Sequence, residues 1–166
     1  MKKEEELPDE TAEDESEGGT RKPKFIPVNF RDACVSRVQD HLGQPLVKRS
    51  FAVYSSPEEA LVVICINSRE YKKVTHTGYW FAFHSHQRDL LQNYKRAFVA
   101  LGCGSPDLVF LIPALEFVSW LDRFHKTERG DRFYWHVRVT KGKGGYFVQV
   151  KKGTDQGKLD KYILRS

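Results

Sequence analysis

No apolar run in this sequence is longer than seven residues, and the longest covers residues 60–66. A helix that crosses a bilayer needs about 20 apolar residues, so the sequence predicts no membrane-spanning segment and no membrane partner. The N-terminal segment is acidic, whereas a secretory signal carries basic and then apolar residues. We therefore expect a soluble protein that is located in the cytoplasm.

Cysteine is scarce, and the chain has only Cys34, Cys65 and Cys103. Their number is odd, their spacings are wide and their neighbours are apolar. This pattern favours neither a disulfide framework nor a zinc knuckle. We predict three buried free thiols in a reducing compartment.

Charge is divided unevenly along the chain. Residues 1–24 hold nine acidic and five basic residues, while 13 acidic and 22 basic residues follow, which gives the later part a net charge of +9. The first part lacks the apolar residues that offset the entropy of ordering, so we predict a disordered acidic tail over residues 1–24 and a single globular domain over residues 25–166. The tail either screens the basic domain from non-specific contacts or is simply solvated.

Apolar periodicity predicts the elements of the first half of the domain. Phe30, Cys34, Val38 and Leu42 recur every four residues, which predicts a helix over residues 30–42. Alternation predicts a strand over residues 47–54, and the apolar run from residue 61 to 66 predicts a strand that is covered on both faces.

The densest apolar stretch, residues 78–113, is the predicted centre of the fold. It contains a strand over residues 78–84, a helix over 86–94, and strands over 97–101 and 108–112 that pair as a hairpin. Beyond it we expect a helix over 114–124, strands over 133–139 and 146–150 joined by a loop over 140–145, and a short element near Leu159. The predicted class is α+β, with a central mixed β-sheet flanked by helices.

One predicted strand carries a basic and aromatic face. Because alternate residues of a strand share a face, Arg132, Tyr134, His136 and Arg138 should form a row that offers guanidinium groups to phosphates and rings to bases. Lys141 and Lys143 in the adjoining loop, and Lys151 beyond it, would extend this surface. The row predicts a nucleic-acid partner, and the alternative is an ordinary solvated strand face.

A pair of short motifs resembles the signature of the PD-(D/E)xK, or restriction-endonuclease-like, superfamily. Pro57-Glu58 is followed after eleven residues by Glu70-Tyr71-Lys72. The resemblance implies that Glu58 and Glu70 hold a divalent metal that activates water for phosphodiester cleavage, and that Lys72 helps to position the water. Mg²⁺ would then be the cofactor, and restriction or phage defence would be a fitting setting.

The sequence departs from that signature in one respect. In the family a chain reversal separates the first acid from the (D/E)xK strand, but the apolar run from residue 61 to 66 contains no turn residue. An extended chain would hold the two carboxylates too far apart to share one ion. We therefore expect a nucleic-acid-binding domain on a nuclease-like scaffold that is catalytically inactive and needs no cofactor.

Two alternatives to this function remain open at this point. An active Mg²⁺-dependent nuclease would use Glu58, Glu70 and Lys72. A protein-interaction module would use the exposed aromatic residues and the acidic tail to bind a protein partner or a second copy of the chain. Finally, His84 and His86 could ligate a metal together with Asp89 or Cys103, but no second ligand pair follows at a recognised spacing, so we predict no metal site.

Overall fold

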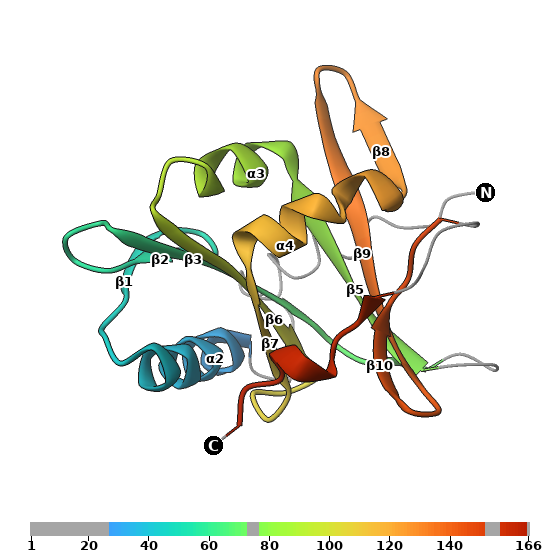
Figure 1. The fold of residues 1–166 in the computed structure, drawn as a ribbon, viewed down its shortest axis with the longest axis horizontal. Helices are drawn as coiled ribbons and strands as arrows, with labels where there is room; N and C mark the ends of the chain where they lie inside the picture. Colours follow the sequence, from blue (N-terminus) through green and yellow to red (C-terminus); the bar gives the residue numbers. More distant parts are fainter. Residues whose placement is uncertain (1–26, 73–76, 152–156, 166) are drawn as a thin grey trace.

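The computed structural model describes residues 27–72, 77–151 and 157–165, and the predicted acidic tail over residues 1–24 lies outside them. The described strands form two sheets (Figure 1). In spatial order, sheet A contains β1 (Val47–Ser50), β2 (Val53–Ser55), β3 (Leu61–Ser68), β6 (Arg96–Cys103) and β7 (Val109–Pro113). Sheet B contains β11 (Gly157–Lys158), β10 (Gly145–Val148), β9 (Arg132–Gly142), β5 (Thr77–His84) and β4 (Tyr71–Lys72), and β8 (Lys126–Arg129) pairs with β9.

The described helices are fewer than the described strands. They are α2 (Pro27–Leu42), α3 (Ser85–Leu91), α4 (Ala114–Ser119) and two short 3₁₀ helices, η1 (Leu121–Arg123) and η2 (Asp160–Tyr162). The predicted α+β class is confirmed, with the mixed sheet A at its centre, and the antiparallel sheet B adds a second layer of strands. Among the described residues, no helix has the length and apolar content to cross a membrane.

The two sheets arise from one parallel connection. β3 and β6 pair in parallel, with Leu61 opposite Arg96 and Ser68 opposite Cys103. Two parallel neighbours cannot be joined by a tight turn and need a crossover. Here the crossover consists of β4, β5 and α3, and β5 lies in sheet B. The connection therefore carries the chain from one sheet into the other and back.

The main core lies between the sheets. Phe81 and Phe83 of β5 face Phe110 of β7, and each of these side chains is at most 2% exposed. Phe117 of α4 closes the core at one end, with its ring centroid 4.8 Å from that of Phe83. Full burial of such a side chain contributes about 1.5–3 kcal/mol, so this layer is a major source of stability.

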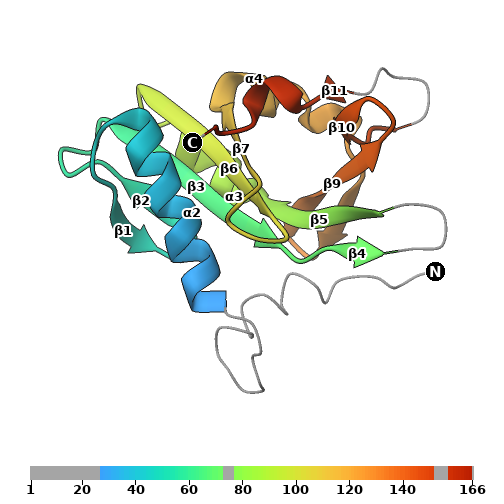
Figure 2. The same ribbon diagram turned by 90° about the horizontal axis from the view of Figure 1, so that it is seen from below.

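A smaller core lies on the other face of sheet A, where α2 packs across the strands (Figure 2). Cys34 and Val38 of α2 are fully buried there against Val63 and Cys65 of β3. This arrangement confirms the predicted helix and the prediction that β3 is covered on both faces, since all eight of its residues are buried. All three cysteines are free and buried, also as predicted.

The predicted strand over residues 47–54 is wrong as a continuous element. The chain instead reverses at Phe51 and Ala52, so that β1 and β2 pair antiparallel with Val47 opposite Ser55. Ala52 has a φ of 67°, in the left-handed region that usually favours glycine or asparagine. Because this turn contains neither glycine nor asparagine, its sequence does not predict a chain reversal.

Candidate nucleic-acid interface

The candidate site is the face of sheet B that points away from sheet A, which we call the outer face. Strand alternation assigns the opposite face to the core, because Tyr79, Phe81, Val137 and Val139 are buried in the inter-sheet cluster. The cross-strand pairs then give the outer-face residues: Tyr71, Gly78, Trp80, Ala82, His84, Thr127, Arg129, Arg132, Tyr134, His136, Arg138, Thr140, Phe147 and Lys158. This set contains four Arg or Lys residues and no Asp or Glu.

Five rings form a continuous row on the outer face, which we call the ring row. In spatial order it consists of His86, His84, Tyr134, His136 and Trp80, where His86 extends the row from the start of α3. Successive ring centroids are 5.5, 5.5, 5.2 and 5.7 Å apart. These separations lie within the range of favourable aromatic pairs. The residues come from β5, β9 and α3, so three elements position one row.

Hydrogen bonds fix the orientation of the ring at the centre of the site. Trp80 Nε1–H donates to His136 Nδ1 at 3.1 Å, and Thr127 Oγ1 lies 2.7 Å from His136 Nε2. An indole nitrogen can only donate, so His136 Nδ1 must accept. In the neutral imidazole the proton then sits on Nε2 and is donated to Thr127. The tautomer of His136 is therefore set by its two neighbours.

Guanidinium groups flank the ring row at both ends. Arg132 lies opposite Arg129 across β8 and β9, two residues before Tyr134, and Arg138 lies opposite Trp80 across β9 and β5. Arg132 and Arg138 are both exposed. They lie six positions apart along the strand, which corresponds to about 20 Å. The outer face thus combines ring surfaces in its middle with positive charge at its ends.

The exposed end of the ring row is electrostatically unfavourable for a further cation. Although the His86 side chain is exposed, partial desolvation of its imidazole lowers its pKa, and the neighbouring His84 and Arg132 lower it further, while Asp89 acts in the opposite direction. His86 therefore loses its proton more readily than an ordinary histidine. An anion bound beside Arg132 would reverse part of this effect, since it would favour the imidazolium form.

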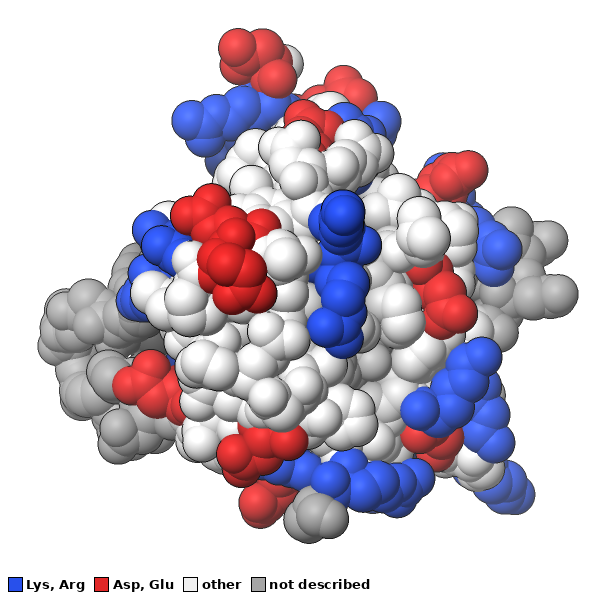
Figure 3. Space-filling view, turned by 60° about the vertical axis from the view of Figure 1, so that its left-hand side comes forward, with Lys and Arg blue, Asp and Glu red and all other residues white. Residues whose placement is uncertain are grey.

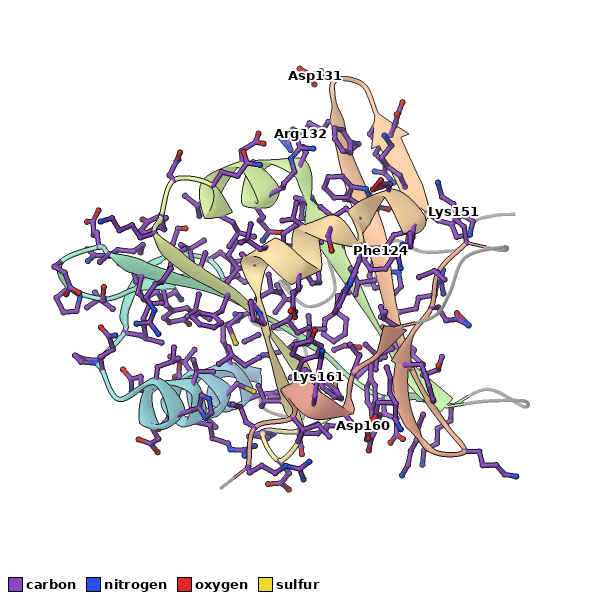
Figure 4. All side chains as sticks on the ribbon, in the orientation of Figure 1. Phe124, Asp131, Arg132, Lys151, Asp160 and Lys161 are labelled. Atoms are coloured by element: carbon purple, nitrogen blue, oxygen red, sulfur yellow. The ribbon has the colours of Figure 1, made fainter. Side chains whose placement is uncertain are left out.

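The tip of the β8–β9 hairpin is braced from the core side. The guanidinium carbon of Arg88 on α3 lies 5.4 Å from the ring centroid of Trp135, and Lys126 Nζ lies 4.6 Å from that of Phe133. Such cation–π contacts contribute about 0.5–1 kcal/mol each at exposed positions. Figure 4 shows Arg132 beside Asp131 at this tip, far from η2 and from Lys151. The bracing holds the Arg132 end of the row in place.

The structure brings together only part of the predicted basic surface. Arg132, Tyr134, His136 and Arg138 do share one face of β9, but Tyr134 is only 8% exposed, so its ring contacts other rings more than solvent. Lys141 alternates with the outer-face residues of β9 and so lies on the core side of sheet B. Its Nζ is 5.9 Å from the ring centroid of Tyr146 there. It therefore does not extend the row.

The remaining two predicted lysines also lie apart from the row. Lys143 belongs to the two-residue turn that joins β9 to β10, at the end of β9 remote from Arg132. Lys151 follows β10, and its backbone N–H donates to the carbonyl of Arg123 at 2.8 Å, which places it beside η1. Neither lysine continues the alternation that aligns the outer face.

The three residues of the nuclease-like motif are not assembled into a site. Glu58 precedes β3 and Glu70 follows it, so the eight-residue strand lies between them. Eight residues of strand extend for about 26 Å, which is too far for two carboxylates to share an ion. Lys72 lies on β4 at the edge of sheet B. The geometry agrees with the argument from the uninterrupted apolar run.

The described residues also contain no cluster of three or more His, Cys, Asp or Glu side chains that could hold a metal ion. His84 and His86 do lie together, but their rings are stacked and form one end of the ring row. Cys103 is 2% exposed within the inter-sheet core and is not available to them.

The charge pattern of the outer face differs from that of the surface in Figure 3. That view brings forward the left side of Figure 1, and it shows several small basic groups and several small acidic groups on the same face. A surface of mixed sign attracts polyanions weakly, because neighbouring charges cancel at a short distance. The described strand residues of the outer face, in contrast, include no Asp or Glu.

Sequence reasoning missed Trp80, Thr127 and Arg129 as members of the site. Trp80 could have been assigned from alternation within β5, because Trp80, Ala82 and His84 share a face opposite the apolar residues. Thr127 lies on β8, a strand without apolar residues that no periodicity predicts. His84 and His86 had been noted only as possible metal ligands.

Comparisons with protein-family models, with curated proteins and with solved structures found no match to this chain.

Proposed function

We propose that this protein binds nucleic acid through the outer face of sheet B. The observation that carries the proposal is the ring row flanked by Arg132 and Arg138 on a face whose strand residues include no carboxylate. Guanidinium groups form strong hydrogen bonds with phosphates, and rings provide surfaces on which bases stack. The net charge of +9 after residue 24 supports the same partner through long-range attraction.

Single strands fit this face better than duplexes. The bases of a duplex stack on one another, whereas an unpaired base can turn toward a protein ring. The first contacts would be made by His86, which is exposed, and by the half-buried His84 and His136. Tyr134 and Trp80, each 8% exposed, would support those rings from within the row.

We propose binding without cleavage. The separation of Glu58 from Glu70 by β3 supports this proposal. Binding through the outer face requires no cofactor and does not depend on the resemblance to restriction-endonuclease-like proteins. The three buried free thiols suit a reducing compartment, so we also propose a cytoplasmic location.

The test is a titration of labelled single- and double-stranded DNA and RNA followed by fluorescence anisotropy, at several salt concentrations. Replacing Arg132 and Arg138 together by alanine should lower the affinity for single strands by on the order of tenfold at 0.1 M salt, and should lower the slope of log affinity against log salt by about 1.4. The matched control replaces Lys141 and Lys143, which removes the same charge from outside the row.

The control variant should keep most of the affinity of the parent chain. Equal losses from the two double variants would mean that net charge, and not the outer face, governs binding. Absence of binding to all four nucleic acids at low salt would overturn the proposal itself. Parallel reactions with Mg²⁺, resolved on a gel, test cleavage, and Mg²⁺-dependent products that disappear in Glu70→Ala would restore the nuclease alternative.

A further inference from the structure

The outer face is a large surface that the described helices leave uncovered. Helix α2 packs on sheet A, α4 packs on the inter-sheet core, and α3 contacts the core side of the hairpin through Arg88. Its residues Arg129, Arg132 and Arg138 are exposed, whereas Trp80 and Tyr134 are each 8% exposed. A basic and aromatic face of this kind invites a polyanionic occupant.

The same chain contains a segment of complementary charge. All nine acidic residues of the first 24 fall within residues 4–17, and that stretch has no lysine or arginine. Nine carboxylates on 14 consecutive residues form a dense line of negative charge, similar in kind to the phosphate line of a nucleic acid strand. Charge complementarity therefore makes residues 4–17 a fitting occupant of the outer face.

The point at which this segment joins the fold is close to the outer face. Phe30, in the first turns of α2, lies next to Gly102, since a Cβ added to Gly102 would be 3.2 Å from its ring. Gly102 pairs with Asn67 near the end of β3. The next residue, Ser68, accepts a hydrogen bond through its Oγ from the backbone N–H of Trp80 at 3.0 Å. The start of α2 thus lies near the β4–β5 edge of sheet B.

The tether is long enough to reach the whole row. Residues 18–26 connect the acidic stretch to α2, and nine residues span up to about 30 Å when extended. The outer face measures about 20 Å between Arg132 and Arg138. A short tether also keeps the segment at an effective concentration in the millimolar range, so even weak docking is populated.

From these observations we infer that residues 4–17 of this chain dock on the outer face of sheet B and compete there with nucleic acid. The inference rests on the proposed function for its competition step, but the docking itself is a separate event. Docking through carboxylates and guanidinium groups weakens with salt, because exposed charges are screened within about 10 Å at 0.1 M ionic strength. The docked segment would exclude polyanions that bind the outer face weakly. A nucleic-acid strand that also stacks its bases on the ring row would displace it.

The decisive variant keeps the full chain and removes only the charge of the segment. Its nine acidic residues are replaced by the corresponding amides at Glu4, Glu5, Glu6, Asp9, Glu10, Glu13, Asp14, Glu15 and Glu17. At 50 mM salt we expect this variant to bind a labelled single-stranded oligonucleotide about tenfold more tightly than the parent chain, and the difference to vanish near 0.5 M salt. A control with the same nine acids in permuted order within residues 4–17 should behave like the parent.

A second measurement detects docking without nucleic acid. A labelled synthetic peptide of residues 1–24 should bind the amide variant at 50 mM salt and should not bind that variant when it also carries Arg132→Glu and Arg138→Glu. The unlabelled oligonucleotide should displace the peptide. Circular dichroism and thermal melting of each variant establish that it is folded.

The outcomes separate the two proposals. Peptide binding together with no oligonucleotide binding by any variant would support docking and overturn the nucleic-acid proposal. Equal oligonucleotide affinity of the parent and the amide variant, with no peptide binding, would overturn docking and leave the nucleic-acid proposal standing. Peptide binding that survives both charge reversals would place the segment elsewhere and would also overturn the inference.

Discussion

Sheet A and sheet B differ in how many of their faces are buried. Every residue of β3 in sheet A is buried, because α2 covers one face and sheet B covers the other. In β9 of sheet B, Val137 and Val139 on the core side are buried, while Arg132 and Arg138 on the outer face are exposed. Packing therefore determines which residue types β3 carries on both of its faces, but it determines those of β9 on the core side alone.

This difference separates structural from functional information. The apolar side chains of sheet A are sufficiently explained by the cost of leaving them in water. The arginines and histidines on the outer face of sheet B lie outside both core clusters, so burial in a core does not explain their presence there. Changes in the core should accordingly alter stability most, changes at Arg132 and Arg138 should alter binding, and changes in the ring row should have a smaller effect on stability.

The largest effect should come from the layer that both sheets share. Phe110→Ala removes a ring that is fully buried between the sheets, and we expect a loss of about 3–5 kcal/mol in the free energy of unfolding. Urea denaturation measures this loss. The control is Leu115→Ala at a position that is 87% exposed, where a change within about 0.5 kcal/mol is expected. A loss below about 1 kcal/mol for Phe110→Ala would contradict the two-sheet core.

A glycine in each sheet gives the second comparison. A Cβ at Gly102 of β6 would lie 2.5 Å from Asn67 Oδ1 and 2.8 Å from Cys34 Sγ. Gly102→Ala should therefore overpack the α2 side of sheet A and destabilise the protein by about 1–3 kcal/mol. At Gly142 of β9 the nearest contact would be an ordinary 3.7 Å to the ring of Phe147. Equal melting temperatures for the two alanine variants would contradict this contrast.

A substitution within the ring row should have an intermediate effect. Trp80→Phe removes the N–H that donates to His136 Nδ1 but keeps an aromatic ring. We expect a loss of about 1 kcal/mol in stability, the size of one hydrogen bond. Nitrogen chemical shifts of His136 should show that its tautomer is no longer single. An unchanged single tautomer would mean that Thr127 alone fixes this ring.

The smallest effect should be a dependence of stability on pH. The folded protein lowers the pKa of His86 below its ordinary value of 6.5 through partial desolvation, His84 and Arg132. The unfolded chain therefore takes up a proton first as the pH falls, so stability should decrease from about pH 6.5 downward. His86→Gln should make this part of the slope shallower, as measured by denaturation between pH 5 and pH 7. An unchanged slope in His86→Gln would contradict this prediction.

Periodicity predicted the elements that are held by their own apolar faces. The repeat from Phe30 to Leu42 gave α2, and the apolar run after residue 60 gave β3. The helix predicted over residues 114–124 ends earlier, since α4 stops at Ser119 and η1 begins at Leu121. Strand β8, with the sequence Lys-Thr-Glu-Arg, was missed because pairing with β9 and not an apolar pattern holds it in place.

The candidate site shows the same limit. Alternation within β9 correctly grouped Arg132 with Arg138, because that rule needs only one strand. The bond between Trp80 and His136 joins residues 56 positions apart, and no local pattern indicates that β5 and β9 are neighbours. Lys141 was assigned to the predicted basic surface although it sits at an odd position of the strand. Alternation therefore predicts which residues of one strand share a face, but it does not predict which strands lie beside that strand in the sheet.

The hydrogen bonds of the ring row also have a direction. The N–H of Trp80 points to His136, and the N–H of His136 points to Thr127, so both protons are directed toward β8. The Thr127 hydroxyl accepts at the end of this chain and keeps its own hydrogen for a third partner. The centre of the face is thereby polarised as a hydrogen donor, which would let it discriminate between ligands of equal charge by whether they present a carbonyl or an amino group there.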